Sequence, residues 1–148
     1  MYEYLIVQGV YLLRILLAAL CGWLIGYERE NNLKMAGVRT HTIVAVTSAL
    51  MMLISKYGFY DILHLDNIGL DPSRIAASIV TAIGFLGAGV IFTKNLNVSG
   101  LTTAAGIWAT VGIGMSLGAG MYMTGICCTV FLLLLQFLLH RNLRINRS

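Results

Sequence analysis

Charged side chains gather where one apolar run of the sequence ends and the next begins. Glu28, Arg29 and Glu30 close the first run, and Arg39 and His41 open the second after a short loop. Carboxylates and cations placed this way can meet across the loop, because ionisable groups at the edge of a membrane tend to find partners. They would then either hold a polar pocket together or supply its active groups. A solvated helix end is the third interpretation, and all three stay open.

A second charged pair stands at the start of another apolar run. Asp71 is a favourable helix N-cap, Pro72 suits the first helical position, and Arg74 follows Asp71 by three residues. Capping with a local ion pair explains these residues, and ion binding is the alternative. Further along, Asn97, Thr102 and Thr103 flank the start of a helix, where free N–H groups bind an anion or are capped locally. The candidate polar functional cluster therefore comprises Glu28, Arg29, Glu30, Arg39, Thr40, His41, Asp71, Arg74, Asn97, Thr102 and Thr103.

Metal binding and catalysis find little support in the residue pattern. Asp61, His64 and Asp66 have the types that ligate a divalent cation, but solvated loop residues look the same and the spacing does not discriminate. We therefore assign no metal. The sequence has no Ser/His/Asp order, no phosphate-binding loop ending in Lys-Ser/Thr and no C-x-x-C motif. The sequence predicts a protein that is not an enzyme and that carries no cofactor.

The composition predicts a membrane protein. The chain has 148 residues, of which 58% are apolar and 11% charged, and its mean hydropathy is +0.82. A soluble domain carries about 25% charged residues. Apolar runs at about 5–27, 39–55, 75–92, 100–117 and 120–139 are of the length that crosses a bilayer. We expect an all-α fold, a polytopic transmembrane helical bundle of about five spans, which forms a single domain over residues 1–148.

Basic residues predict the orientation of this bundle. Those in the loops and tail on one side are Arg29, Lys34, Arg39, Lys94, Arg141, Arg144 and Arg147. Only Lys56 and Arg74 lie on the other side. The positive-inside rule then places the N-terminus outside and the C-terminus in the cytoplasm. The basic residues form no single patch, so we expect no nucleic-acid partner.

Small residues predict which spans pack closely, because glycine lets helix backbones approach in lipid. The candidate packing positions are Gly22, Gly26, Gly84, Gly87, Gly89, Gly112, Gly114 and Gly118. We expect spans one, three and four to form the tight centre and span five to face lipid. Arg14 interrupts span one, and it either snorkels to the outer interface or pairs within the protein.

Five sequence blocks, in order, resemble the MgtC/SapB family of membrane proteins. They are Gly22–Glu30 (GWLIGYERE), Lys34–His41 (KMAGVRTH), Asp71–Ala77 (DPSRIAA), Ile83–Phe92 (IGFLGAGVIF) and Asn97–Ala105 (NVSGLTTAA). The sequence departs from the family pattern at Met35, where proline is common, and at Ser99, where arginine is common. Ser99 removes a charge from the turn and weakens the case for anion binding there.

The resemblance implies a multi-pass protein of the bacterial inner membrane, linked to growth under magnesium limitation. It also implies action on other membrane proteins, among them the ATP synthase and magnesium-transporting ATPases. Relatives linked to virulence carry a soluble C-terminal domain, so this chain is expected to resemble the short, membrane-only members. The expected function is regulation through helix–helix contacts, with membrane lipid, other integral membrane proteins and a second copy of the chain as partners. The alternative is a small conductor of ions or protons, or a magnesium-related transporter.

Overall fold

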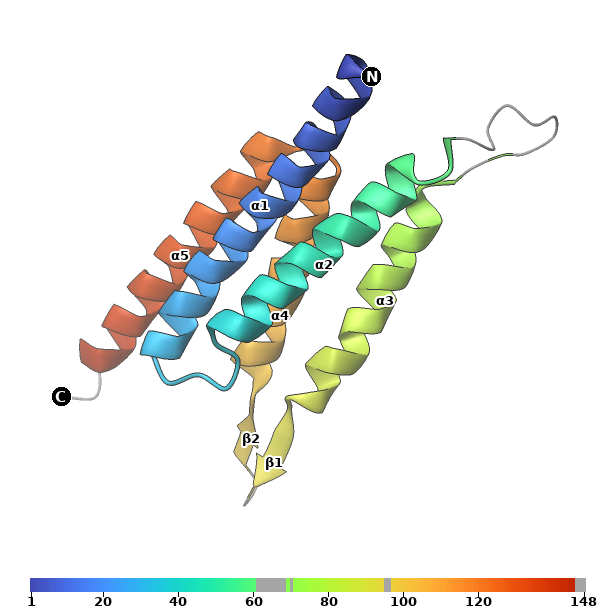
Figure 1. The fold of residues 1–148 in the computed structure, drawn as a ribbon. Helices are drawn as coiled ribbons and strands as arrows, with labels where there is room; N and C mark the ends of the chain where they lie inside the picture. The colour runs from blue at the N-terminus through green and yellow to red at the C-terminus, as the bar shows by residue number, and fades with distance from the viewer. Residues whose placement is uncertain (61–68, 70, 95–96, 146–148) are drawn as a thin grey trace.

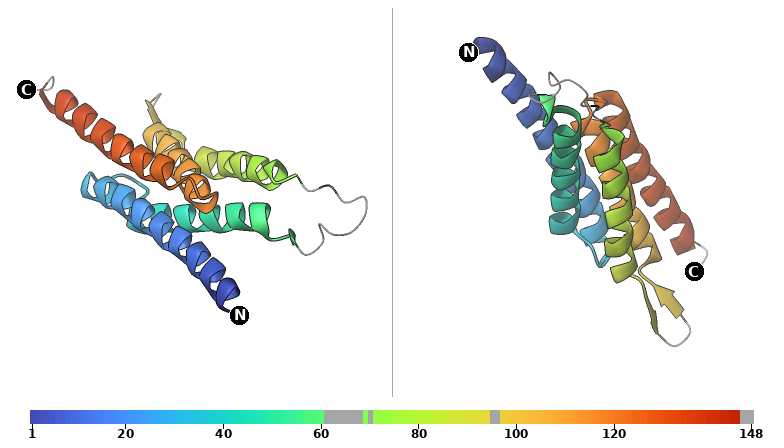
Figure 2. Two further views of the ribbon diagram at one scale, coloured as in Figure 1. Left: turned by 90° about the horizontal axis from the view of Figure 1, so that it is seen from above. Right: turned by 90° about the vertical axis from the view of Figure 1, so that its right-hand side faces the viewer.

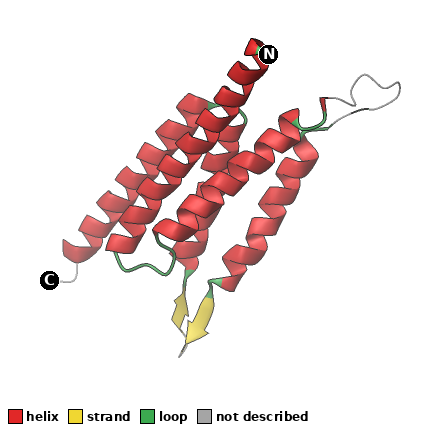
Figure 3. Ribbon diagram, in the orientation of Figure 1, coloured by secondary structure: helices red, strands yellow, loops and turns green. Residues whose placement is uncertain are grey.

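The computed structural model describes residues 1–60, 69, 71–94 and 97–145. The elements in chain order are α1 (Tyr2–Asn31), α2 (Val38–Tyr57), α3 (Ser73–Gly89), β1 (Phe92–Lys94), β2 (Asn97–Ser99), α4 (Leu101–Gly118) and α5 (Tyr122–Ile145) (Figure 1). Helices dominate the described residues, and the two short strands form one antiparallel hairpin (Figure 3). The expected all-α transmembrane fold is confirmed.

Four of the helices in the described part of the chain, α1, α2, α4 and α5, are long and apolar enough to cross a membrane. The remaining helix, α3, is apolar but has 17 residues. At 1.5 Å per residue it is about 26 Å long, slightly less than the roughly 30 Å hydrocarbon core. The helices alternate in direction, and the chain termini lie at opposite ends of the bundle (Figures 1 and 2).

We name the two ends of the bundle by what they carry. The hairpin end holds the α1–α2 loop and the β1–β2 hairpin, and the amino end holds the N-terminus and the α4–α5 turn (Figure 1). The predicted side of the membrane for each end stays a prediction.

Glycines set the distance between α1 and α2. A Cβ at Gly22 would lie 2.6 Å from the carbonyl oxygen of His41, and one at Gly26 would lie 2.6 Å from the Cα of Val38. Real Cβ atoms do not approach so closely, so only glycine permits this contact between backbones. The two helices therefore touch along the half of α1 that leads to the hairpin end.

The same arrangement joins α2 to α4. A Cβ at Gly114 would collide with the carbonyl oxygen of Ala45, and one at Gly118 would collide with that of Ala49. Both alanines are fully buried. Around these contacts lies the main apolar core, formed by Ala18, Cys21, Ile25, Ala45, Ala49, Ile113 and Leu117. Helices α1, α2 and α4 are thus the centre of the bundle.

The expectation that span three belongs to the tight centre is wrong. Ile83 is the buried residue of α3, and a Cβ at Gly84 or Gly89 would meet open space within the chain. A Cβ at Gly87 would make an ordinary contact with Ala104 at 3.7 Å. The glycines of α3 therefore do not bring it close to its neighbours, and α2 takes the central place with Ala45 and Ala49 at its contacts with α4. Both α3 and α5 lie at the periphery.

The end of the third span also differs from its predicted position at residue 92. Helix α3 ends at Gly89, and Phe92 already pairs with Ser99 in the hairpin. The hairpin then leads into α4 through Gly100, which has a φ of 90°. A Cβ at this position would collide with the carbonyl oxygen of Val90. Only glycine readily adopts this conformation.

The start of α3 differs from the prediction by one residue, because the N-cap is Pro72 and not Asp71. The Asp71 carboxylate accepts hydrogen bonds from the Ser73 hydroxyl (2.6 Å) and the Ser73 backbone N–H (2.9 Å), and the helix begins at Ser73. These bonds, with a smaller contribution from the Arg74 charge, lower the pKa of Asp71 below its usual value. The Asp71 carboxylate, which precedes α3, is therefore ionised near neutral pH.

We predict that Gly26→Leu destabilises the folded protein, whereas Gly84→Leu does not. The leucine at position 26 would collide with the backbone of α2, and such overpacking costs about 1–3 kcal/mol. The side chain at position 84 meets open space, so this variant is the matched control. Thermal unfolding in detergent measures both. Equal melting temperatures would contradict the close α1–α2 contact.

Candidate functional site

A buried polar cluster lies at the hairpin end, where the last turns of α1 meet the first turns of α2 and α4. Arg29 of α1 is 2% exposed and His41 of α2 is fully buried. Thr103 and Thr110 of α4 are 4% and 0% exposed. The glycine contacts between the three helices bring these side chains together. We call these four residues the Arg29 cluster.

The hydrogen-bond partner of the Arg29 guanidinium is a neutral hydroxyl group. Its Nη2 donates a hydrogen bond to the Thr103 hydroxyl at 3.2 Å. Its Nε–H is buried and has no hydrogen-bond partner among the described residues. A cation in such a place is costly, since a buried charge normally needs both a partner and hydrogen bonds.

The proton positions of His41 follow from its contact with Thr110. The Thr110 hydroxyl donates to the carbonyl oxygen of Gly106 at 2.8 Å, so its proton is already in use. His41 Nδ1 lies 2.8 Å from the same hydroxyl and must therefore be the donor. A neutral His41 then presents a lone pair at Nε2, which is buried without a partner in the described part of the chain.

Gly106 provides the space in which these two side chains lie. A Cβ at Gly106 would be 3.6 Å from His41 Cε1 and 3.9 Å from the Cζ and Nε atoms of Arg29. Both side chains thus border the same position of α4. Near Gly106 the cluster thus presents a donor, Arg29 Nε–H, and an acceptor, His41 Nε2, for which the described residues supply no hydrogen-bond partner.

The carboxylates near this cluster bond to the α1–α2 loop. Glu28 Oε1 accepts a hydrogen bond from Asn32 Nδ2 at 2.7 Å, while Oε2 is buried with no partner among the described residues. Glu30 Oε2 accepts from the backbone N–H of Val38 at 2.9 Å, which caps the start of α2. Arg39 points away, with an exposed side chain.

The structure divides the predicted polar cluster. It brings Arg29, His41 and Thr103 together, with Glu28 at the helix end beside them. Six predicted residues have exposed side chains outside the Arg29 cluster; these are Glu30, Arg39, Asp71, Arg74, Asn97 and Thr102, and Thr40 is partly exposed. The loop carboxylates Asp61 and Asp66, together with His64, lie outside the described residues.

Two residues of this site escaped the sequence analysis, Gly106 and Thr110. The spacing of Thr103, Gly106 and Thr110 already indicates that they share one face of α4, because residues three and four apart are neighbours on a helix. The sequence did not say which face of α4 turns toward α1 and α2.

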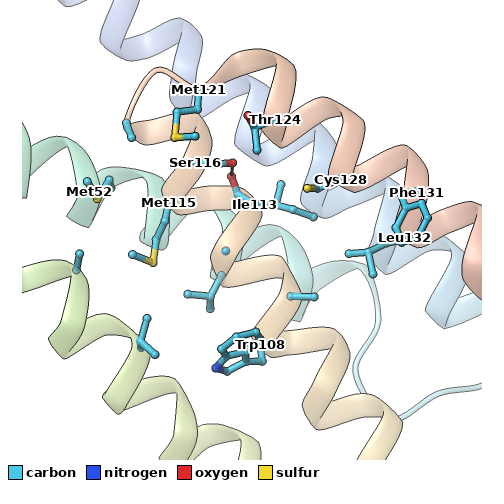
Figure 4. A pocket seen from close by; sticks show the side chains of 16 residues that line it. Met52, Trp108, Ile113, Met115, Ser116, Met121, Thr124, Cys128, Phe131 and Leu132 are labelled. Atoms are coloured by element: carbon cyan, nitrogen blue, oxygen red, sulfur yellow. Dashed lines mark hydrogen bonds between the residues drawn. The ribbon is translucent and has the colours of Figure 1, made fainter. Parts of the chain in front are cut away.

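A second feature is an apolar groove between α3 and α5, with α4 as its floor (Figure 4). Its volume is about 640 Å³. Trp108, Gly112 and Ser116 of α4 lie along the floor, and the Trp108 side chain is 58% exposed. Methionines border it from three segments, Met52, Met115 and Met121. We call this feature the α3–α5 groove.

Together, fold and sites define a multi-pass helical membrane protein with a buried cationic cluster and an apolar groove along its central helix. The model of one family, described as the MgtC family, matches residues 15–144, and the chain belongs to this family. The family resemblance seen in the sequence is thereby confirmed.

Two relatives show how far the similarity extends. Escherichia coli K12 has a protein named "Putative magnesium transporter YhiD", which is 52% identical over 131 residues, covering 88% of this chain and 61% of the relative. "Protein MgtC" of Salmonella typhimurium strain LT2 is 42% identical over 138 residues, covering 93% of this chain and 56% of the relative. The chain thus spans about 60% of the length of these relatives. No solved structure matches it.

We predict that Thr103→Val destabilises the protein, because it removes the hydrogen-bond partner of the buried Arg29 guanidinium. Leaving a buried donor unsatisfied costs about 1–3 kcal/mol. Thr102→Val is the matched control, since Thr102 is the next residue of α4 and is exposed. Thermal unfolding in detergent compares the two. If both variants melt like the unmodified protein, Thr103 does not support Arg29.

Proposed function

We propose that this chain is a non-enzymatic regulator in the bacterial inner membrane, active under magnesium limitation, that binds a transmembrane helix of another integral membrane protein. Membership of the MgtC family and the name of the Escherichia coli relative, "Putative magnesium transporter YhiD", support the link to magnesium. The proposed partners are membrane ATPases, either the ATP synthase or a magnesium-transporting ATPase. The observation that carries the proposal is the α3–α5 groove.

The lining of the groove favours a helix as its occupant. Ala109, Gly112 and Ser116 are small residues on one face of α4, and a Cβ at Gly112 would meet open space within the chain. Small residues at helical spacing let another helix approach closely in lipid. This stretch of α4 is about 10 Å long, or roughly two helical turns.

The side walls of the groove support the same interpretation. Methionine side chains adapt to varied partner surfaces and are common in grooves that bind helices. Met52, Met115 and Met121 come from α2, α4 and the turn before α5. The exposed Trp108 adds a large anchor of the type that is enriched at protein interfaces.

We predict that Gly112→Leu weakens partner binding but leaves the chain folded. The added side chain would fill the floor of the groove, and overpacking of about 1–3 kcal/mol corresponds to a loss of about 5- to 150-fold in affinity. Gly84→Leu is the matched control, because its side chain also meets open space but lies outside the groove lining. Gly114→Leu is unsuitable, since it would collide with α2.

Site-specific photocrosslinking in cells grown at low magnesium measures this binding. A photoreactive residue replaces Trp108, and the crosslinked membrane protein is identified by mass spectrometry. We expect one crosslinked partner that Gly112→Leu removes and Gly84→Leu keeps. Crosslinks to lipid alone, or to proteins insensitive to Gly112→Leu, would contradict the proposal. A crosslink to a second copy would instead make the groove a self-association surface.

A second candidate function, ion or magnesium transport, has one observation in its favour besides the name of YhiD. Glu28 Oε2 is a buried carboxylate oxygen without a partner among the described residues. Carboxylate oxygens suit Mg²⁺. The adjacent Arg29 works against this function, because a buried guanidinium repels a divalent cation approaching the same end of the bundle.

Ion flux in proteoliposomes separates the two functions. We predict no flux of protons, sodium, potassium or magnesium above that of empty liposomes, given folded and inserted protein. Flux that Glu28→Gln abolishes would make the chain a conductor and overturn the regulator proposal. Glu3→Gln is the control, because Glu3 is an exposed carboxylate at the other end of α1.

A further inference from the structure

Arg14 connects four helices near the amino end. Its Nε donates to the Tyr122 hydroxyl at 3.0 Å, and its Nη1 donates to the Tyr57 hydroxyl at 3.0 Å and to the carbonyl oxygen of Gly118 at 3.1 Å. The guanidinium also lies over the rings of Tyr11, Tyr57 and Tyr122, 5.3–5.8 Å from their centroids. Of the two alternatives for Arg14, snorkelling to the outer interface or pairing within the protein, the structure shows pairing.

Lys56 lies beside this arrangement. Its Nζ donates to the carbonyl oxygen of Ala119 at 2.9 Å and lies 5.3 Å from the centroid of the Tyr57 ring. The side chain is exposed, and the ammonium group has three donors. Every hydrogen-bond partner that the structure gives Arg14 and Lys56 is a neutral oxygen. Two basic side chains therefore lie close together at the amino end, next to the C-terminus of α4.

A groove lies between α1 and α2, and Tyr57, the partner of Arg14, is one of its lining residues. Its volume is about 420 Å³. Aliphatic side chains line most of it, namely Leu12, Ile15, Leu50, Leu53 and Ile54. Gln8, Tyr11, Tyr57 and Gly58 form its polar part. Tyr57 links groove and charges, because it lines the groove, accepts from Arg14 and packs beside Lys56.

We propose that the α1–α2 groove binds one anionic phospholipid. An acyl chain lies along Leu12, Ile15 and Leu50, and the phosphate lies at the polar part, where Lys56 contacts it directly. Arg14 acts as a positioning residue, since it fixes the Tyr57 ring against which Lys56 packs. The proposal does not depend on the function proposed above, because the α1–α2 groove shares no lining residue with the α3–α5 groove.

The chemistry of the two parts matches that of a phospholipid. An aliphatic groove accepts a hydrocarbon chain, tyrosine rings suit the depth of the headgroups, and basic pockets between transmembrane helices bind anionic headgroups. The aromatic residues of this region support the same depth, because the rings of Tyr11, Tyr57 and Tyr60 form two tilted pairs with centroid distances of 5.0 and 6.0 Å, and Tyr60 is exposed.

Native mass spectrometry of the purified protein in detergent tests the proposal. Phosphatidylglycerol and phosphatidylcholine with the same acyl chains are titrated separately. We expect adducts of the anionic lipid at a concentration about fivefold or more below that of the zwitterionic lipid, as one basic contact near a membrane surface predicts. Lys56→Gln removes this preference. Lys34→Gln is the matched control, because Lys34 is also exposed but lies at the hairpin end.

A second variant tests whether the acyl chain binds in the groove. Leu50→Trp fills the groove and is expected to weaken the binding of both lipids, while thermal unfolding shows that the protein remains folded. Equal affinity for the two lipids, or equal effects of Lys56→Gln and Lys34→Gln, would overturn the proposal. Two further results, if found together, would also overturn it. Glycerophosphoglycerol, the headgroup without acyl chains, would bind as tightly as the whole lipid, and Leu50→Trp would leave lipid binding unchanged.

Discussion

The backbone contact between α1, α2 and α4 is the constraint on which the rest of the structure depends. In lipid, apolar side chains gain little by leaving their surroundings, so helices associate through close packing and interhelical hydrogen bonds. Gly22 and Gly26 permit that packing on one side of α2, and Gly114 and Gly118 permit it on the other. With larger residues at these positions the helices would separate, and the polar side chains between them would lose their partners.

Each end of this three-helix centre holds an arginine with neutral partners. Arg29 bonds to a threonine hydroxyl at the hairpin end, and Arg14 bonds to tyrosine hydroxyls and a carbonyl oxygen toward the amino end. A guanidinium in a transmembrane helix is costly unless such groups solvate it, and each arginine therefore ties neighbouring helices together.

The peripheral helices give the protein its accessible surfaces. Because α3 and α5 pack loosely beside α4, the α3–α5 groove leaves Trp108 and Gly112 open to the membrane. A rigid centre with an open side is suited to binding a further helix, in keeping with the regulator that we propose for this MgtC-family chain. The relatives are longer than this chain, which matches about 60% of their length.

The sequence by itself determined the helical membrane fold, the approximate positions of the helices and the family. These follow from the length of apolar runs and from local side-chain chemistry, which act within a few residues of the chain. Only the tertiary structure decided which glycines touch another helix, that α2 rather than α3 is central, and that Thr110 joins His41. The sequence could not predict these features, because a helix with small residues on several faces does not specify which face meets which neighbour. Gly112 and Gly114 illustrate this, since they are two residues apart on α4 and only Gly114 contacts α2.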